Sequence, residues 1–309
     1  MNEVTYARNP LMSDFTENYF ETKDGVKLRY LHKGEGVPFI LLHGYGDDAD
    51  SWLMNAPAFA EHFSVYCLDQ RGHSFSRADH GARISRLAAD VHEFIEFLGA
   101  PKVNLLGHSM GCSVIWSYID LFGQDKLNKV IFDDEPVMLV SNPRFSREDI
   151  MITSSNPMDI WQLVNAIADN GSLWYVEDSA FMKAFPACFR RGILWYTEDE
   201  MKQIPDGYLE KFSQRPPQPE VMSNQFMADL LKDHLMLDWR DMLHLIKVPT
   251  MFISGEVSHA TTKEMCDWFV EQIPHCELVK FTEEEYGNHD LAQTAHKKFN
   301  RVVLEFLKK

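Results

Sequence analysis

Several features that mark common protein classes are missing from this sequence. No apolar run approaches the length needed to span a bilayer, and residues 1–15 contain neither a basic stretch nor an apolar one, so we expect no membrane insertion and no signal peptide. Cysteine is scarce: the five residues are odd in number, irregularly spaced and never arranged as C-x-x-C. This pattern argues against a disulfide framework and predicts buried thiols in a reducing cytoplasm.

Motifs for metals and nucleotides are also missing, and positive charge is in short supply. There is no H-E-x-x-H and no G-x-x-x-x-G-K-[ST], so we expect neither a metal nor any other cofactor. The 46 Asp and Glu residues outnumber the 30 Lys and Arg residues, which gives a net charge of −16. Such a surface disfavours nucleic acid and anionic membranes as partners, and we interpret the acidity as a contribution to solubility.

Strands and helices alternate along most of the chain, and 45% apolar residues in 309 are enough for a sizeable core. Buried strands are predicted at residues 38–42, 64–68, 102–106, 129–132, 250–254 and 276–281, after a β-hairpin that turns at Asp24-Gly25. Helices are predicted at residues 52–63, 84–98, 110–122, 261–272 and 295–307. The alternation predicts an α/β fold, a mostly parallel twisted sheet with helices on both faces.

Residues 137–238 break this alternation, because helical stretches follow one another there and prolines interrupt them. We expect residues 1–136 and 239–309 to form the core, and residues 137–238 to form a helical cap inserted after the strand that ends at Asp134. The cap would cover the C-terminal edge of the sheet, where sites form in open α/β folds. It is rich in methionine and aromatic residues, and Trp174 and Phe185 are candidates for an apolar substrate pocket.

The most informative stretch is Gly107-His108-Ser109-Met110-Gly111, which fits G-x-S-x-G between a predicted strand and a predicted helix. A chain that reverses so sharply leaves no room for Cβ atoms beside the serine, so both outer positions require glycine. The turn exposes the serine hydroxyl and directs backbone N–H groups of the helix start toward the same point. Ser109 is therefore the candidate nucleophile.

Other stretches accompany this turn: H-G-Y-G at residues 43–46, D-Q-R-G-H-S at residues 69–74, and His289 between the last predicted strand and the last helix. Together with Ser109 they resemble the α/β-hydrolase fold superfamily, in its esterase and haloperoxidase branch with a helical cap. The resemblance covers nearly the whole chain beyond residue 18. It implies a hydrolase in which His289 takes the proton from Ser109 and later gives it to the leaving group.

The acid of the implied triad departs from the commonest pattern of this superfamily. Many of its members carry an aspartate in a G-x-x-D setting, but here Ser258 stands at that place. A second solution in the superfamily has the acid one strand earlier, where Asp133-Asp134-Glu135 follows a predicted strand. Asp134 is the candidate acid, because Asp133 would be the last strand residue and would face the other way. Asp133 and Glu256 remain as alternatives.

The resemblance also implies an oxyanion hole from the backbone N–H groups of Tyr45 and Met110. The function expected is hydrolysis of a small-molecule carboxylic ester or lactone with an apolar group, through an acyl-enzyme. A cofactor-free haloperoxidase or perhydrolase, a C–C hydrolase, and a ligand-binding receptor with a vestigial triad are the alternatives. Dehalogenases and epoxide hydrolases are disfavoured, because their nucleophile is aspartate and this chain has Ser109.

Overall fold

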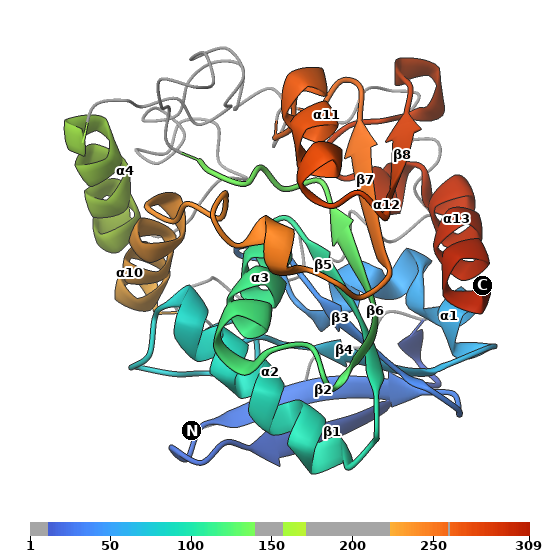
Figure 1. Ribbon diagram of the computed structural model, residues 1–309. Helices are drawn as coiled ribbons and strands as arrows, with labels where there is room; N and C mark the ends of the chain where they lie inside the picture. Colours follow the sequence, from blue (N-terminus) through green and yellow to red (C-terminus); the bar gives the residue numbers. More distant parts are fainter. Residues whose placement is uncertain (1–11, 140–156, 171–222, 259) are drawn as a thin grey trace.

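A computed structural model describes residues 12–139, 157–170, 223–258 and 260–309. Eight strands form one sheet in the order β1-β2-β4-β3-β5-β6-β7-β8, seen nearly edge-on in Figure 1. Strands β1 and β2 pair antiparallel with each other, and β2 pairs antiparallel with β4. All pairs from β4 to β8 are parallel. The α/β fold class expected from the alternation is confirmed.

The strands are β1 (Thr16–Glu21), β2 (Lys27–Lys33), β3 (Pro38–Leu42), β4 (Ser64–Leu68), β5 (Val103–His108), β6 (Leu127–Asp133), β7 (Thr250–Gly255) and β8 (Cys276–Phe281). Every residue of β5 and β7 is buried, whereas the edge strand β1 is mostly exposed. Central strands are covered on both faces, so they need continuous apolar runs rather than alternating apolar and polar residues. Short apolar runs in the sequence were therefore sufficient to predict where these strands lie.

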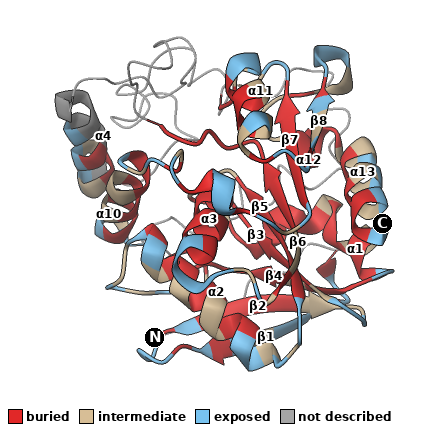
Figure 2. Ribbon diagram, viewed as in Figure 1, coloured by how far each residue is buried: buried red, intermediate tan, exposed pale blue. Residues whose placement is uncertain are grey.

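Helices cover both faces of the sheet. They are η2 (Ala49–Met54), α1 (Ala56–Ala60), α2 (Ile84–Leu98), α3 (Met110–Phe122), α4 (Pro157–Asn170), α10 (Asn224–Leu235), η3 (Leu243–Leu245), α11 (Lys263–Gln272), η4 (Glu283–Glu285), α12 (Leu291–Thr294) and α13 (His296–Lys308). Helices α2, α3, α10 and α11 contribute to one buried apolar cluster, and η2, α1, α12 and α13 to the cluster on the other face. Figure 2 shows the buried sheet between these layers. Within the described ranges, no helix is both long and apolar enough to cross a membrane.

The helix expected over residues 52–63 is instead two short helices, η2 and α1. Asn55 separates them, and its side-chain amide donates to the backbone oxygen of Ala292 at 2.7 Å and to Asn300 Oδ1 at 2.8 Å. Pro57 lies in the first turn of α1, where a missing N–H costs nothing. The periodicity of this stretch could not reveal the break, because its cause is a contact with the other end of the chain.

The two ends of the expected cap lie side by side. Met138 forms an isolated antiparallel bridge with Asp238, and the Trp239 N–H donates to the Val137 oxygen at 3.0 Å. Between these ends the structure describes α4 and α10, which pack against each other at the left of Figure 1. Trp174 and Phe185, the candidate pocket residues, lie outside the described residues.

Candidate active site

Ser109 connects β5 to α3 in a backbone conformation that non-glycine residues rarely adopt, with φ 50° and ψ −127°. Its N–H donates to the Asp133 oxygen of the neighbouring strand at 2.9 Å, and its own oxygen accepts from the Cys112 N–H at 2.7 Å. Such a conformation costs on the order of 1–3 kcal/mol, and the surrounding hydrogen bonds must hold it in place. The turn therefore has the geometry expected of G-x-S-x-G.

The two glycines of this turn are required by close approach. A Cβ on Gly107 would lie 2.4 Å from the carbonyl carbon of Gly111, and a Cβ on Gly111 would lie 2.3 Å from the oxygen of Leu42. Carbon atoms do not approach backbone atoms this closely without displacing them. Alanine at either position would move Ser109 relative to β3 and β5.

His289 and Asp134 meet at the C-terminal edge of the sheet. His289 Nδ1 lies 2.7 Å from Asp134 Oδ2, across 155 residues of sequence. Asp134 follows the last residue of β6 with φ 54° and is fully buried. The Asp134 carboxylate accepts the hydrogen bond, so in the neutral ring Nδ1 carries the proton and Nε2 is the acceptor nitrogen.

The environment of His289 favours its protonated form. Burial of the ring lowers its pKa, but the hydrogen bond to Asp134 and the negative charge of that carboxylate outweigh burial and raise the pKa of His289 to about 9. The side chain of His289 is 15% exposed, while that of Asp134 has no exposed surface. A buried charge of this kind stabilises an imidazolium where one must form during proton transfer.

The two alternative acids are placed differently. Asp133 is the last residue of β6, and neither of its buried carboxyl oxygens has a hydrogen-bond partner among the described residues. Burial, together with the charge of Asp134, raises the pKa of Asp133 well above its usual range. Glu256 is exposed, and its Oε2 accepts from the Glu283 N–H at 3.1 Å.

His108, inside the serine turn, is buried and contacts the loop that carries His289. Its Nε2 donates to the backbone oxygen of His289 at 3.0 Å, and the two rings lie 4.9 Å apart between centroids. Burial and the nearby His289 lower the pKa of His108 to about 4, so its ring is neutral. His108 therefore packs beneath the serine turn and holds the backbone of His289 next to the residue that precedes Ser109.

The residues expected to form the oxyanion hole adjoin Ser109. A Cβ on Gly44 would lie 3.2 Å from the Ser109 Cβ, which places the residue before Tyr45 against the serine. Met110 is the first residue of α3, where helix N–H groups are unpaired by the helix itself. Gln70 holds the loop after β3 in place through two hydrogen bonds to His43. Its N–H donates to His43 Nε2 at 3.0 Å, and its side-chain amide donates to the His43 oxygen at 2.6 Å.

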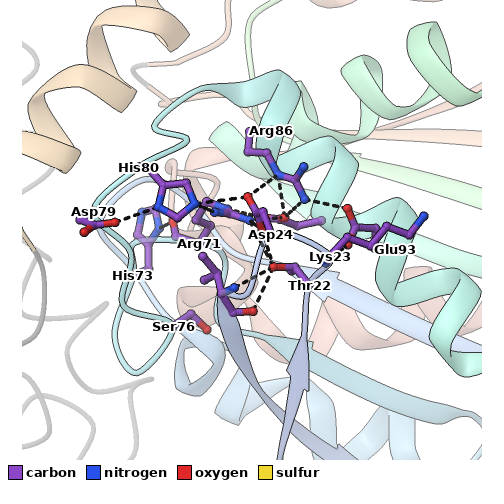
Figure 3. Close-up of polar contacts among 12 residues, drawn as sticks. Thr22, Lys23, Asp24, Arg71, His73, Ser76, Asp79, His80, Arg86 and Glu93 are labelled. Carbon is purple, nitrogen blue, oxygen red and sulfur yellow. Dashed lines mark hydrogen bonds and ion pairs between the residues drawn. The ribbon is translucent and has the colours of Figure 1, made fainter.

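The motif at residues 69–74 is structural, because its arginine lies at the centre of a buried ion-pair network (Figure 3). Arg71 is fully buried; its Nε lies 2.7 Å from Asp90 Oδ2, and its Nη2 lies 2.7 Å from Asp24 Oδ1. Arg86 Nη2 binds the same Asp90 at 2.8 Å. The network joins the β1–β2 turn to helix α2 and to the loop after β4.

Helix α10 contacts the loop that carries Tyr45 and the start of α2, and the sequence predicted neither contact. The Tyr45 hydroxyl donates to the Met227 oxygen at 2.8 Å, and Asp233 Oδ2 caps the N-terminus of α2 by accepting from the Ile84 N–H at 2.8 Å. A Cβ on Gly72 would overlap the ring of Phe226 at 2.0 Å. The helix thus borders the loops that carry residues 44–46 and 69–74.

A second attachment of α10 is a buried polar cluster next to the candidate acid. Glu135 Oε1 lies 3.1 Å from His234 Nε2 of α10, and both side chains are at most 5% exposed. The Trp239 indole donates to the Ser113 hydroxyl at 3.1 Å on α3. Glu135 therefore joins α10 to the strand end that carries Asp134.

Two hydroxyl groups that bind Asp134 were also missed at the sequence level. Thr261 Oγ1 donates to Asp134 Oδ1 at 2.6 Å, and Ser258 Oγ donates to Asp134 Oδ2. Ser258 stands where many α/β-hydrolases have the acid of the triad. From the sequence this position indicated only that the usual carboxylate is missing, not that a hydroxyl there binds Asp134. In the part of the chain that the structure describes, no group of three or more His, Cys, Asp or Glu side chains could hold a metal, and the four cysteines there are free and buried.

Comparison with known proteins identifies the family of this chain. The family model of the alpha/beta hydrolase fold matches residues 37–291. The pimeloyl-[acyl-carrier protein] methyl ester esterase of Vibrio parahaemolyticus is 25% identical over 284 residues, which cover 91% of this chain and 98% of that one. A component of the acetoin cleaving system of Cupriavidus necator, a dihydrolipoyllysine-residue acetyltransferase, is 36% identical, but only over 97 residues, which span 26% of its length.

A solved structure with the same fold is that of bromoperoxidase from Bacillus anthracis, with a TM-score of 0.78 and 23% identity over 95% of this chain and all of the other. The family model covers far more than half of the 309 residues, including the elements that carry Ser109, Asp134 and His289. On this match, the chain belongs to the alpha/beta hydrolase fold family.

Proposed function

We propose that this protein is a serine hydrolase that cleaves a carboxylic ester or lactone bearing an apolar group. Ser109 is the nucleophile, His289 the general base and acid, and Asp134 the residue that orients His289 and stabilises its charge. The observation that carries the proposal is the 2.7 Å contact between His289 Nδ1 and the buried carboxylate of Asp134, together with the strained turn that holds Ser109.

In the acylation step, Ser109 Oγ attacks the substrate carbonyl carbon, and its proton passes to His289 Nε2. The carbonyl oxygen becomes an oxyanion, which the N–H groups of Tyr45 and Met110 stabilise by hydrogen bonds fixed before the reaction. The tetrahedral intermediate then collapses. The C–O bond to the leaving alcohol breaks, and that oxygen takes the proton from His289, which leaves an ester on Ser109.

Deacylation repeats these steps with water. His289 Nε2 removes a proton from water as its oxygen attacks the acyl carbon, and the same proton returns to Ser109 Oγ when the acyl–serine bond breaks. The products are a carboxylic acid and an alcohol, joined in one molecule when the substrate is a lactone. The carboxylate of Asp134 stabilises the imidazolium of each step.

Residues 137–238 form a cap over this site in our proposal, and the cap binds the apolar part of the substrate. Two observations support it: Met138 and Asp238 pair where the segment leaves and rejoins the core, and α10 is bonded to the loop of Tyr45. Trp174 and Phe185 remain proposed pocket residues. An esterase similar over nearly the whole length of both chains supports an ester as the substrate.

The test is a screen of esters and lactones of graded acyl length, with Ser109→Ala as the control. Turnover that disappears in Ser109→Ala supports the proposal, and retention of more than about a tenth of the activity would exclude a covalent mechanism. If a fluorophosphonate labels Ser109 but no ester or lactone is turned over, a ligand-binding receptor with a vestigial triad is the better description. Halogenation or perhydrolysis without ester turnover would favour the haloperoxidase alternative.

A further inference from the structure

The carboxylate of Asp134 binds more than His289. Thr261 Oγ1 donates to Asp134 Oδ1 at 2.6 Å, and Ser258 Oγ donates to Oδ2, the oxygen that also faces His289. Thr261 is buried, and Ser258 is half-buried. Both hydroxyls come from the segment after β7, which carries no acid at the place where many α/β-hydrolases have one.

The hydroxyl of Thr261 is the end of a buried chain of donors whose direction is fixed. Thr261 Oγ1 lies 3.0 Å from Ser254 Oγ, which lies 3.2 Å from Cys266 Sγ. Each hydroxyl has one proton. Because Thr261 gives its proton to Asp134, it must accept from Ser254, and Ser254 must in turn accept from the Cys266 thiol. Burial raises the pKa of Cys266 to about 11, so this thiol keeps the proton that it donates.

The O–H and S–H groups of this series of hydrogen bonds point their positive ends toward Asp134, which affects the His289 imidazole on the other side of the carboxylate. Donors to a carboxylate spread its negative charge and weaken its attraction for a neighbouring imidazolium. The aligned O–H and S–H dipoles also oppose a positive charge on His289 directly, and low dielectric surroundings strengthen both effects. The more tightly Asp134 holds the proton of His289, the higher the pH at which His289 can accept the proton of Ser109.

We propose that Thr261, supported by Ser254 and Cys266, is a positioning residue that weakens the hold of Asp134 on the His289 proton and so lowers the pH above which His289 can act as a base. Ser258 acts in the same direction at the other carboxylate oxygen. The inference rests on the proposed function, since it assigns these residues through the same triad. It explains why Ser258 and Thr261 lie where many α/β-hydrolases have the acid. Their hydroxyls weaken the attraction between His289 and the carboxylate that the neighbouring strand β6 supplies.

Other charged or titratable groups also face His289, and the substitutions proposed below leave these groups in place. Asp133 and Glu135 flank Asp134 on the β6 side, Asp290 directly precedes α12, and His108 packs against the ring from β5. None of them bonds to Thr261 in the structure as described. A change at Thr261 therefore reaches His289 through Asp134.

The experiment is an NMR titration of the His289 imidazole in the whole protein, with its signal assigned by its loss in His289→Gln. Thr261→Val removes the hydroxyl and keeps the shape, and it should move the pKa of His289 upward by roughly 0.5–1 pH unit, the equivalent of one neutral hydrogen bond. The ascending limb of kcat/KM against pH should move by the same amount. Thr261→Ser keeps the donor and should restore both values.

Thr250→Val is the matched control, because Thr250 is a buried threonine at the other end of β7 whose hydroxyl donates to the Val248 oxygen at 2.8 Å. It should leave the titration of His289 unchanged. Should Thr261→Val fail to fold, Ser254→Ala keeps the bond from Thr261 to Asp134 and removes the dipole behind it. We expect a smaller upward shift there.

An unchanged or lowered pKa of His289 in folded Thr261→Val and Ser254→Ala would overturn the inference, as would an equal shift in Thr250→Val. The NMR readout also separates the two proposals. If turnover depends on Ser109 but the pKa does not move, the hydrolase stands and the role of Thr261 falls. If the pKa moves as expected but activity is independent of Ser109, the proposed function falls instead.

Discussion

Replacing Asp134 by asparagine keeps the shape of the side chain and removes the charge that faces His289. The rise in the pKa of His289 from 6.5 to about 9 measures how strongly Asp134 and its surroundings favour the imidazolium. It corresponds to about 3 kcal/mol, or roughly a 300-fold change in rate if the whole of it acts in the transition state. Loss of the orienting carboxylate also disturbs the tautomer, so we expect a total loss of roughly three to four orders of magnitude in kcat.

Two neighbouring carboxyl groups provide matched controls. Asp133→Asn replaces a buried carboxyl group, whose pKa burial raises well above its usual range, with a neutral amide, and Glu256→Gln changes an exposed side chain that bonds to the Glu283 N–H. Both should cost less than about tenfold in kcat, because neither removes a charge that binds His289. The assay is steady-state ester hydrolysis, with folding checked by circular dichroism.

The pattern of the three variants decides the assignment of the acid. A severe loss only in Asp134→Asn supports it. A mild effect of Asp134→Asn together with a crippling effect of Glu256→Gln would refute the reasoning and make Glu256 the acid. The pH profile adds a second check, since the apparent pKa of the basic group should fall in Asp134→Asn, where burial still lowers it and only the more weakly acting Asp290 and Glu135 raise it.

Further predictions follow from the same contacts. The pKa of His289 is raised to about 9 in the folded state, so its contribution to the free energy of unfolding is complete below pH 6.5 and is lost as pH rises through about 9. Denaturant titrations at a series of pH values should show a loss of up to about 3 kcal/mol in the wild type but not in His289→Gln. Adding Ser258→Asp to Asp134→Asn should recover part of the lost kcat, because the new carboxylate comes from a position that contacts the same site. Replacing Trp174 or Phe185 with alanine should change the ratio of kcat/KM between long and short acyl esters if the cap binds the acyl group; equal ratios would place the pocket elsewhere.

Local steric and periodic signals predicted much of this fold. The bounds of α2 and α3 followed from apolar spacing that ends at Gly99 and Gly123, and both glycines have positive φ. The glycines at 107 and 111 followed from the lack of space around a strand–turn–helix reversal, which involves only nearby residues. The alternation of strands and helices was sufficient to predict the α/β class.

The features that the sequence did not predict depend on contacts between distant residues. Thr261 meets Asp134 across 127 positions, and Tyr45 reaches the Met227 oxygen across 182. No periodicity or motif marks such a pair, because threonine and tyrosine are ordinary core and loop residues until the fold brings a partner to them. The same reason explains why η2 and α1 were expected as one helix: the contacts that separate them come from the C-terminal helices.

The central claim, a covalent intermediate on Ser109, is tested most directly by mass spectrometry of the intact protein. After brief mixing with an activated ester at acid pH, where deacylation is slow, the wild type should gain the mass of one acyl group, and peptide mapping should place it on Ser109. Ser109→Ala should gain none, and His289→Gln should acylate far more slowly. Turnover of the same ester without any acylated Ser109 under these conditions, or acylation at the same rate in Ser109→Ala, would contradict the account.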